Sequence, residues 1–366
     1  MNGSPPSAIG HDEFTGLMAP FAPFESNPVL AVGVSGGRDS LSLALLATEW
    51  AAARGGRIVA LIVDHGLRPE SGAEAAATRA LLAAHGVAAE ILPWSGRKPA
   101  SRLQEAARAA RYALLFEACR RHRILHLLVA HHADDQAETV AMRAARASGP
   151  DGLAGMAAAV EHRDGRLLRP LLPIPRVRLT ATLAERRVSW IDDPSNVDPR
   201  FERARLRTQP SAPAAQAGAA ADRAARERRL AEDAVLMLEV EPPDTVVIDQ
   251  AAFACLDRPQ ATRLLARVVQ AVGRRAYPPR RDRLDRAVMR LWQALNHQGP
   301  IRGKSGKGQD FTLSECRLML RQESGRHRLR WIVTPENGRK DSDSVGPPLV
   351  PAAFFACGRQ GTSHLE

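Results

Sequence analysis

Cysteine is scarce in this chain of 366 residues, and no two of its four cysteines stand close together. A CxxC pair is the usual signature of a zinc site or a thioredoxin-like redox motif, so the spacing argues against both. Free thiols in a reducing cytoplasm are the simpler interpretation, and we expect a cytoplasmic protein. The cysteines are Cys119, Cys255, Cys316 and Cys357.

Long apolar runs are also missing. No stretch approaches the ~20 apolar residues that a bilayer-spanning helix needs. The first 24 residues carry Asp12 and Glu13 and have no basic start before an apolar run, unlike a secretory signal. We therefore expect no membrane partner. Aromatic residues make up only 4%, which leaves no evident platform for stacking RNA bases.

Lysine is nearly absent although the chain is strongly basic. The 51 Lys and Arg residues exceed the 40 Asp and Glu residues, and the formal net charge is +11. Such an excess favours a polyanionic partner such as nucleic acid, although a compositional bias towards arginine would produce it equally well. The lysines are Lys98, Lys304, Lys307 and Lys340.

Strand-like and helical patterns alternate between residues 29 and 147. This alternation predicts an α/β fold, with a parallel sheet and helices on both faces. Ligands bind such sheets beyond the carboxyl ends of the strands, which draws attention to the loops after Val34 and Ala130. The apolar runs are 29–34, 58–63, 88–92 and 125–130, and the helical patterns are 39–54, 72–85, 102–121 and 134–147.

The rest of the chain is less regular. Residues 209–221 are rich in Pro, Ala and Gly and nearly uncharged, which is typical of a linker. Beyond them, helical patterns over 222–238, 261–272 and 281–295 and short strands from 311 onward indicate a smaller, mainly helical α+β domain. We predict an N-terminal extension (1–28), a catalytic domain (29–208), a linker (209–221), a C-terminal domain (222–333) and a tail (334–366).

The string Ser-Gly-Gly-Arg-Asp-Ser (35–40) follows the first predicted strand and opens the first predicted helix. Glycines let backbone N–H groups approach a phosphate closely, and the helix N-terminus adds a positive dipole. Ser35 and Ser40 supply hydroxyl groups, and Asp39 is suited to orienting a group or sharing Mg²⁺ with the phosphates. A capped tight turn would explain the two glycines alone. The spacing fits neither the Walker motif nor GxGxxG.

This string resembles the SGGxDS signature of the PP-loop ATP pyrophosphatases, which have a Rossmann-like fold. The resemblance implies cleavage of ATP between its α- and β-phosphates, adenylation of a carbonyl-type oxygen, and displacement of AMP by a nucleophile. It also implies an ATP site made of Ser35, Gly36, Gly37, Arg38, Asp39 and Ser40, with His65 near the adenine.

Further stretches resemble one family of these enzymes, the tRNA(Ile)-lysidine synthetases. The resemblance covers roughly residues 29–207. It implies that lysine is attached to the wobble cytidine of tRNA(Ile) with a CAU anticodon, with ATP and Mg²⁺ required, and family members are often homodimers. The stretches lie at 63–68, 107–112, 130–139, 148–153, 169–172 and 190–196.

Three groups of residues, in these stretches and in the segment 201–207 that follows them, are candidates for chemistry. Arg108 and Arg111 lie three apart and so share a helix face, where they suit phosphate recognition; a solvated face is the alternative. His132, Asp135 and Glu138 recur at intervals of three and suit magnesium, the lysine amine or a base; helix capping is the alternative. Contacts with substrate or tRNA are expected from Asp193, Asn196, Arg203, Arg205 and Arg207, although Ala204 stands where the family usually has Asn.

Two rival functions remain to be weighed. A PP-loop tRNA-thiolating enzyme usually needs catalytic cysteines, and only Cys119 lies in the predicted catalytic domain. A non-catalytic RNA-binding protein with a decayed nucleotide site is the other, and the intact motif residues argue against it. The resemblance implies that the C-terminal domain contacts tRNA, where the sequence itself shows only clustered arginines.

Overall fold

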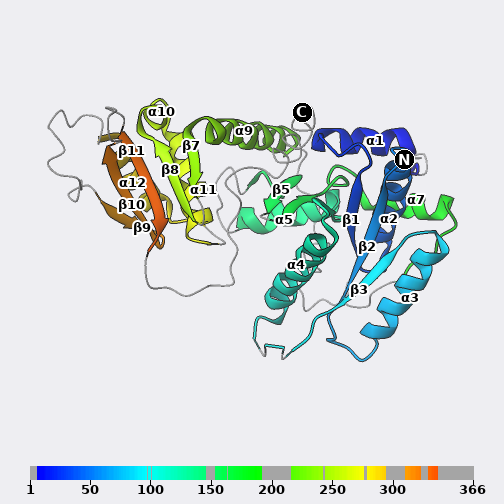
Figure 1. Cartoon of the computed structure of the whole chain (residues 1–366). Coiled ribbons are helices and arrows are strands. Elements are labelled where there is room, and N and C mark those ends of the chain that lie inside the picture. The colour runs from blue at the N-terminus through cyan, green and yellow to red at the C-terminus, as the bar shows by residue number, and fades with distance from the viewer. Residues whose placement is uncertain are drawn as a thin grey trace, which may run out of the picture. The chain divides into compact units, whose positions relative to one another are not determined.

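The computed structural model describes residues 6–96, 98–99, 101–145, 153–162, 164–191, 216–241, 244–275, 278–293, 310–322 and 329–336. They form two compact units, and apart from residues 161–163 the division falls between Ala224 and Ala225 (Figure 1). No helix in these ranges is both long enough and apolar enough to cross a membrane.

The first unit is built on a six-stranded sheet with the order β3-β2-β1-β4-β6-β5. Strand β1 pairs with β2 and β4, β2 with β3, and β4 with β6, and all four pairings are parallel. This arrangement confirms the predicted parallel sheet. The strands are β1 (Val29–Val34), β2 (Arg57–Asp64), β3 (Ala89–Pro93), β4 (His126–Leu128), β5 (Ala159–His162) and β6 (Gly165–Leu168).

Helices cover both faces of this sheet, as predicted. Alternate residues of β1 explain why: Leu30 and Val32 share a core with α2, α3 and α7, whereas Ala31 packs with α4 on the other face. Each face therefore has its own apolar layer. The helices are α2 (Arg38–Ala52), α3 (Ser71–Ala84), α4 (Leu103–His122), α5 (Ala133–Ala145) and α7 (Arg176–Glu185).

The order of the strands places a ligand site between β1 and β4. From β1 the chain builds outward through β2 and β3, and then returns to lay β4 on the opposite side of β1. The connections that leave β1 and β4 therefore diverge. In open α/β sheets the crevice at such a switch point is the usual place for a ligand.

Part of the predicted N-terminal extension contributes side chains to the first unit's core. Helix α1 (His11–Met18) and the short 3₁₀ helix η1 (Ala19–Phe21) bury Phe14, Met18 and Phe21 against α2 and α7. The backbone N–H of Ile9 also donates to Oγ1 of Thr182 at 2.9 Å.

The second unit is an α+β fold with more strand than its sequence predicts. Its antiparallel sheet has the order β7-β8-β11-β10-β9, and α11 packs its apolar face on the buried side. Strands β7 (Leu238–Glu241) and β8 (Thr245–Asp249) and helix α10 (Gln250–Ala254) were not predicted. The other elements are α11 (Arg258–Val272), α12 (Arg281–Gln293), β9 (Phe311–Leu313), β10 (Cys316–Gln322) and β11 (Leu329–Pro335).

Helix α9 (Gln216–Met237) changes the predicted boundary. It begins inside the predicted linker, so residues 216–221 are helical. Alanine is the best helix former, and the Ala-rich sequence that suggested a linker is equally compatible with a helix.

Candidate active site

The glycine loop between β1 and α2 is braced by its own serines. The N–H of Ser35 donates to Oγ of Ser40 at 3.1 Å, and that hydroxyl donates to the carbonyl of Gly37 at 2.9 Å. Gly36 has a φ of +82°, and a Cβ there would lie 2.4 Å from Oγ1 of Thr78. This position therefore requires glycine.

Gly37 has a different role from Gly36. Its φ is −73°, and the nearest atom to an added Cβ would be Oγ of Ser35 at 3.6 Å. The backbone would accept a side chain here, so the missing Cβ leaves room beside the N-terminus of α2. A phosphate group fits that place, because free N–H groups and the helix dipole both favour an anion.

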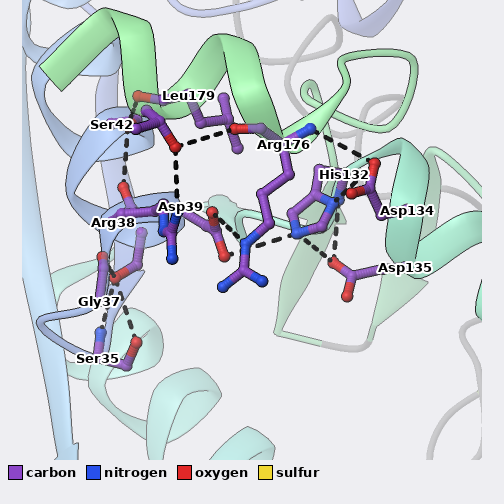
Figure 2. Close-up of polar contacts among 12 residues, drawn as sticks. Ser35, Gly37, Arg38, Asp39, Ser42, His132, Asp134, Asp135, Arg176 and Leu179 are labelled. Carbon is purple, nitrogen blue, oxygen red and sulfur yellow. Dashed lines mark hydrogen bonds and ion pairs between the residues drawn. The ribbon is translucent and has the colours of Figure 1, made fainter. Parts of the chain in front are cut away.

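Asp39 and His132 meet where the two connections diverge. Oδ2 of Asp39 lies 3.5 Å from Nε2 of His132, and Oδ2 of Asp135 lies at the same distance from that nitrogen (Figure 2). Asp135 also accepts a hydrogen bond from the backbone N–H of His132 at 3.1 Å. Asp135 thus caps the start of α5 through the backbone of His132 and also lies beside the His132 ring. The His132 side chain is only 3% exposed.

Neighbouring charges shift the pKa values of His132 and Asp39 in opposite directions. Burial by itself would lower the pKa of His132, but the carboxylates of Asp39, Asp135 and Asp134 outweigh it and the net pKa is raised. Conversely, burial would raise the pKa of Asp39, and the nearby cations His132 and Arg176 lower it instead. The arrangement therefore favours an imidazolium beside carboxylates.

A second cation, Arg176, enters this site from the N-terminus of α7. Its Nε lies 3.6 Å from Oδ1 of Asp39. The loop's own Arg38 is directed elsewhere: it donates to Oγ1 of Thr180 at 3.1 Å, and its guanidinium lies 5.5 Å from the ring centroid of Trp190. Besides His132, Asp39 thus has a cationic neighbour that comes from α7.

A separate group of polar residues lies beyond β2 and on α4. The pKa of His65 is lowered by burial and by the positive charge of Arg111. The guanidinium groups of Arg108 and Arg111 lie 5.2 and 5.6 Å from the ring centroid of Tyr112, so the two arginines do share one side of α4. Burial also lowers the pKa of Arg111. A partly buried cation of this kind is ready to pair with an anionic ligand.

Comparison with known proteins identifies the family. A model of the PP-loop domain matches residues 11–211. The tRNA(Ile)-lysidine synthase of Methylobacterium sp. (strain 4-46) is 42% identical over 320 residues, which are 82% of this chain and 91% of that protein. The chain belongs to the tRNA(Ile)-lysidine synthase family. All motif residues named above lie inside the aligned PP-loop domain.

Other members of the lysidine synthase family match a shorter part. The Rhodopseudomonas palustris protein is 48% identical over 210 residues, which are 57% of this chain and 60% of its own length. The Bradyrhizobium sp. (strain BTAi1) protein is 51% identical, over 51% of this chain and 53% of its length. The chain thus spans little more than half of these two relatives. A U34-tRNA thiolase structure from Methanococcus maripaludis is 18% identical, with a TM-score of 0.46, and covers 59% of this chain and 77% of its own.

Several predicted residues are not brought into the Asp39–His132 contacts. Glu138 lies on α5, one turn beyond Asp135, with a partly buried side chain, and it takes no part in the contacts just given. The neighbouring His131, which was not a predicted site residue, accepts a hydrogen bond at Nδ1 from Arg169 at 3.1 Å. Asp193, Asn196, Arg203, Arg205 and Arg207 lie outside the described residues.

Magnesium is compatible with the described part of this site as a companion of ATP. Within the described ranges, no group of three or more His, Cys, Asp and Glu side chains is placed to hold a metal ion. Mg²⁺ usually keeps several waters and takes one or two carboxylates together with phosphate oxygens. Oδ1 of Asp39 is buried without a hydrogen-bond partner among the described residues, so Asp39 fits as one such ligand.

Sequence analysis missed Arg176 and its anchorage. The available signal was weak: Pro175 directly before Arg176 marks the start of a helix. Nothing in that signal says where the helix docks. The docking appears only in the structure, where Oγ of Ser42 on α2 donates to the carbonyl of Leu179 at 3.0 Å.

Proposed function

We propose that this chain ligates L-lysine to the wobble cytidine of tRNA(Ile) with a CAU anticodon. The observation that carries the proposal is the union, at one switch point, of the PP-loop with the Asp39–His132–Asp135 cluster in a chain of this family. A nucleotide held by the loop would place its α-phosphate next to Asp39, His132 and Asp135, whose side chains can bind protons or carry charge.

The reaction divides into two displacements. The carbonyl oxygen of the cytidine attacks the α-phosphorus of ATP, the bond to the β-phosphate breaks, and pyrophosphate leaves into the glycine loop. The side-chain amine of lysine then attacks the activated carbon, and AMP departs with the original oxygen. Mg²⁺, when bound with ATP, would neutralise phosphate charge during the first displacement.

Each group of residues has a place in this scheme. The N–H groups beside Gly37 and the hydroxyls of Ser35 and Ser40 would hold the pyrophosphate. Arg111 would stabilise charge on the transferred phosphoryl group, and neutral His65 would lie near the adenine. Because lysine enters as an ammonium ion, carboxylates such as Asp135 and Glu138 would bind it and accept its protons.

Transfer of sulfur to tRNA is a weaker proposal than ligation of lysine, because Cys119 is unsuited to it. Cys119 lies on α4 with its thiol buried in the core, and burial raises the pKa of that thiol to about 12. A thiolate is the reactive form of cysteine, so this side chain is suited to packing and not to sulfur transfer.

A decayed site is equally disfavoured. Asp39, His132 and Arg176 each keep a buried polar atom without a hydrogen-bond partner among the described residues. Buried polar groups are normally paired, and three unpaired ones in contact with one another are explained by a ligand that completes them. A protein that had lost its nucleotide would be stabilised by losing these atoms.

The test is incorporation of radiolabelled lysine into bulk bacterial tRNA with ATP and Mg²⁺. We expect label that depends on ATP and is retained by tRNA after acid precipitation. Asp39→Ala should abolish it, whereas Arg186→Gln, which removes an ion pair between the C-terminal ends of α7 and α2 (with Glu49), should not. Folded wild-type protein that releases pyrophosphate with tRNA but transfers no lysine would refute the substrate assignment.

The proposal extends to partners and to the second unit. The name of the relatives includes tRNA(Ile), and the second unit is the expected tRNA-contacting part. Some of its arginines are engaged within the unit, since Arg274 pairs with Asp244 at 3.1 Å and Arg267 with Glu227 at 2.7 Å. Homodimer formation and a cytoplasmic location stay predictions.

A further inference from the structure

Arg176 faces the reaction site although no motif pointed to it. Figure 2 shows its side chain reaching from α7 into the space between Asp39 and His132. Its backbone N–H lies 3.4 Å from Oδ1 of Asp134, which ties the start of α7 to the start of α5. The guanidinium is therefore surrounded by the site's own residues.

The hydrogen bonds of Arg176 are incomplete. Nε of Arg176 is buried and has no hydrogen-bond acceptor among the described residues. Oδ1 of Asp39 lies 3.6 Å from it, which is too far for a hydrogen bond. That oxygen is unpaired as well. No described residue accepts a hydrogen bond from the terminal nitrogens either. A guanidinium group has five N–H donors in a fixed planar arrangement, so most of the donors of Arg176 are available to a ligand.

The position of Arg176 relative to the glycine loop is fixed by packing. Helix α7 is fastened to α2 by the hydroxyl of Ser42, which donates to Leu179, and by the guanidinium of Arg38, which donates to Thr180. Both anchors start within the first turns of the helix that the glycine loop opens. These anchors keep the backbone of Arg176 at a set position relative to the glycine loop, so binding an anion there does not require α7 to move.

The charge balance also requires a cation here. Asp39, Asp134 and Asp135 bring three carboxylates to within 4.0 Å of the His132 ring. Pyrophosphate leaving from ATP adds further negative charge beside them. One imidazolium cannot offset that charge, whereas a guanidinium pairs with phosphate oxygens through two parallel hydrogen bonds.

We propose that Arg176 binds the β- and γ-phosphates of ATP, the half that leaves as pyrophosphate, while Asp39 orients its guanidinium. This inference rests on the proposed ATP-dependent function and adds to it a residue from α7. In this arrangement Arg38 is a positioning residue. Its hydrogen bond to Thr180 holds α7 against α2 and so places Arg176.

The experiment compares two nucleotides by titration calorimetry with Mg²⁺ and without tRNA or lysine: the non-hydrolysable analogue α,β-methylene-ATP and AMP, which lacks the β- and γ-phosphates. Arg176→Gln should weaken the ATP analogue about 10- to 100-fold and AMP less than about twofold, in line with the loss of charge-assisted hydrogen bonds. Arg176→Lys, which keeps the charge but not the fork, should fall between. Arg186→Gln on the same helix should match the wild type.

Equal weakening of both nucleotides would show a structural role, and unchanged affinity for the ATP analogue would show no contact; either overturns the proposal. Should Arg176→Gln fail to fold, the ratio of the two affinities in folded Arg176→Lys decides in the same way. Lysine transfer plays no part in this measurement. A protein that discriminates ATP from AMP through Arg176 but transfers no lysine would contradict the proposed substrate and leave the present inference standing.

Discussion

Nε2 of His132 lies 3.5 Å from Oδ2 of Asp39, although the two residues follow different strands of the sheet. Asp39 stands in the first turn of α2 after β1, and His132 directly precedes α5 after β4. The contact joins the phosphate-binding loop to the residues that would receive the amine. The pair is thus the place where the two half-reactions of a ligase would share groups.

Removing the charge of Asp39 should distinguish a role in the chemical step from a role in binding ATP. We expect Asp39→Asn, which keeps the shape of the side chain, to lower ATP-dependent lysine transfer by about 100-fold or more, as for the loss of other preorganised charges in active sites. Single-turnover assays with saturating ATP measure this effect. A loss confined to the apparent affinity for ATP would contradict a role in the chemical step.

The protonation of His132 should depend on Asp39. Because carboxylates raise the pKa of His132, an NMR titration of its Cε1–H signal should give a value above the ordinary 6.5 in the wild type. In Asp39→Asn the pKa should fall. An unchanged pKa in the variant would show that Asp135 and Asp134 alone set it.

The free energy of unfolding should depend on pH through both His132 and Asp39, with opposite signs. His132 has a raised pKa in the folded state, so its contribution to the free energy of unfolding is complete below pH 6.5 and is lost as pH rises through the raised value. Asp39 has a lowered pKa, so its contribution is present above pH 3.8 and is lost as pH falls through the lowered value. Urea unfolding of the wild type and His132→Asn across pH should show their difference shrinking at alkaline pH.

Gly36 and Gly37 should respond differently to alanine. Gly36→Ala combines a φ of +82° with a Cβ only 2.4 Å from Oγ1 of Thr78, and we expect it to lower the free energy of unfolding by about 1–3 kcal/mol. Adding Thr78→Ala should recover part of that loss. Gly37→Ala should leave urea unfolding nearly unchanged but weaken binding of ATP, since its Cβ would occupy the phosphate's approach.

Native Cys119 should be unreactive. With burial raising its pKa to about 12, it should resist iodoacetamide under conditions that label the exposed Cys255, as mapped by peptide mass spectrometry. Cys119→Ala should retain enzymatic activity. Loss of activity in a folded Cys119→Ala protein would revive the thiolation alternative.

The sequence predicts those parts of the molecule that depend on local pattern. Alternation in β1 and the spacing of the following segments predict the parallel sheet, and the loop string and the His132–Asp135 interval predict the centre of the site. Residues brought in by long-range docking escape such analysis. Arg176 reaches Asp39 only because α7 packs on α2, and Phe14 and Met18 become core only because α1 closes over that pair.

Other errors arose from competing local signals. The alanines of residues 216–221 suggested a linker in company with proline and glycine, yet the helix continues through them. Leu238 continued a helical pattern but begins β7, where cross-strand pairing with Ile248 decides its conformation. Tertiary context overrides propensity at such boundaries.

The most direct test of the whole account is the identity of the product. Transfer RNA from cells that lack the modification would be incubated with the protein, ATP, Mg²⁺ and lysine, digested, and its nucleosides separated by liquid chromatography and mass spectrometry. We predict a cytidine derivative with the mass of cytidine plus lysine less one water, mapped to the wobble position of tRNA(Ile). A sulfur-containing nucleoside, or unmodified cytidine despite conversion of ATP to AMP, would contradict it.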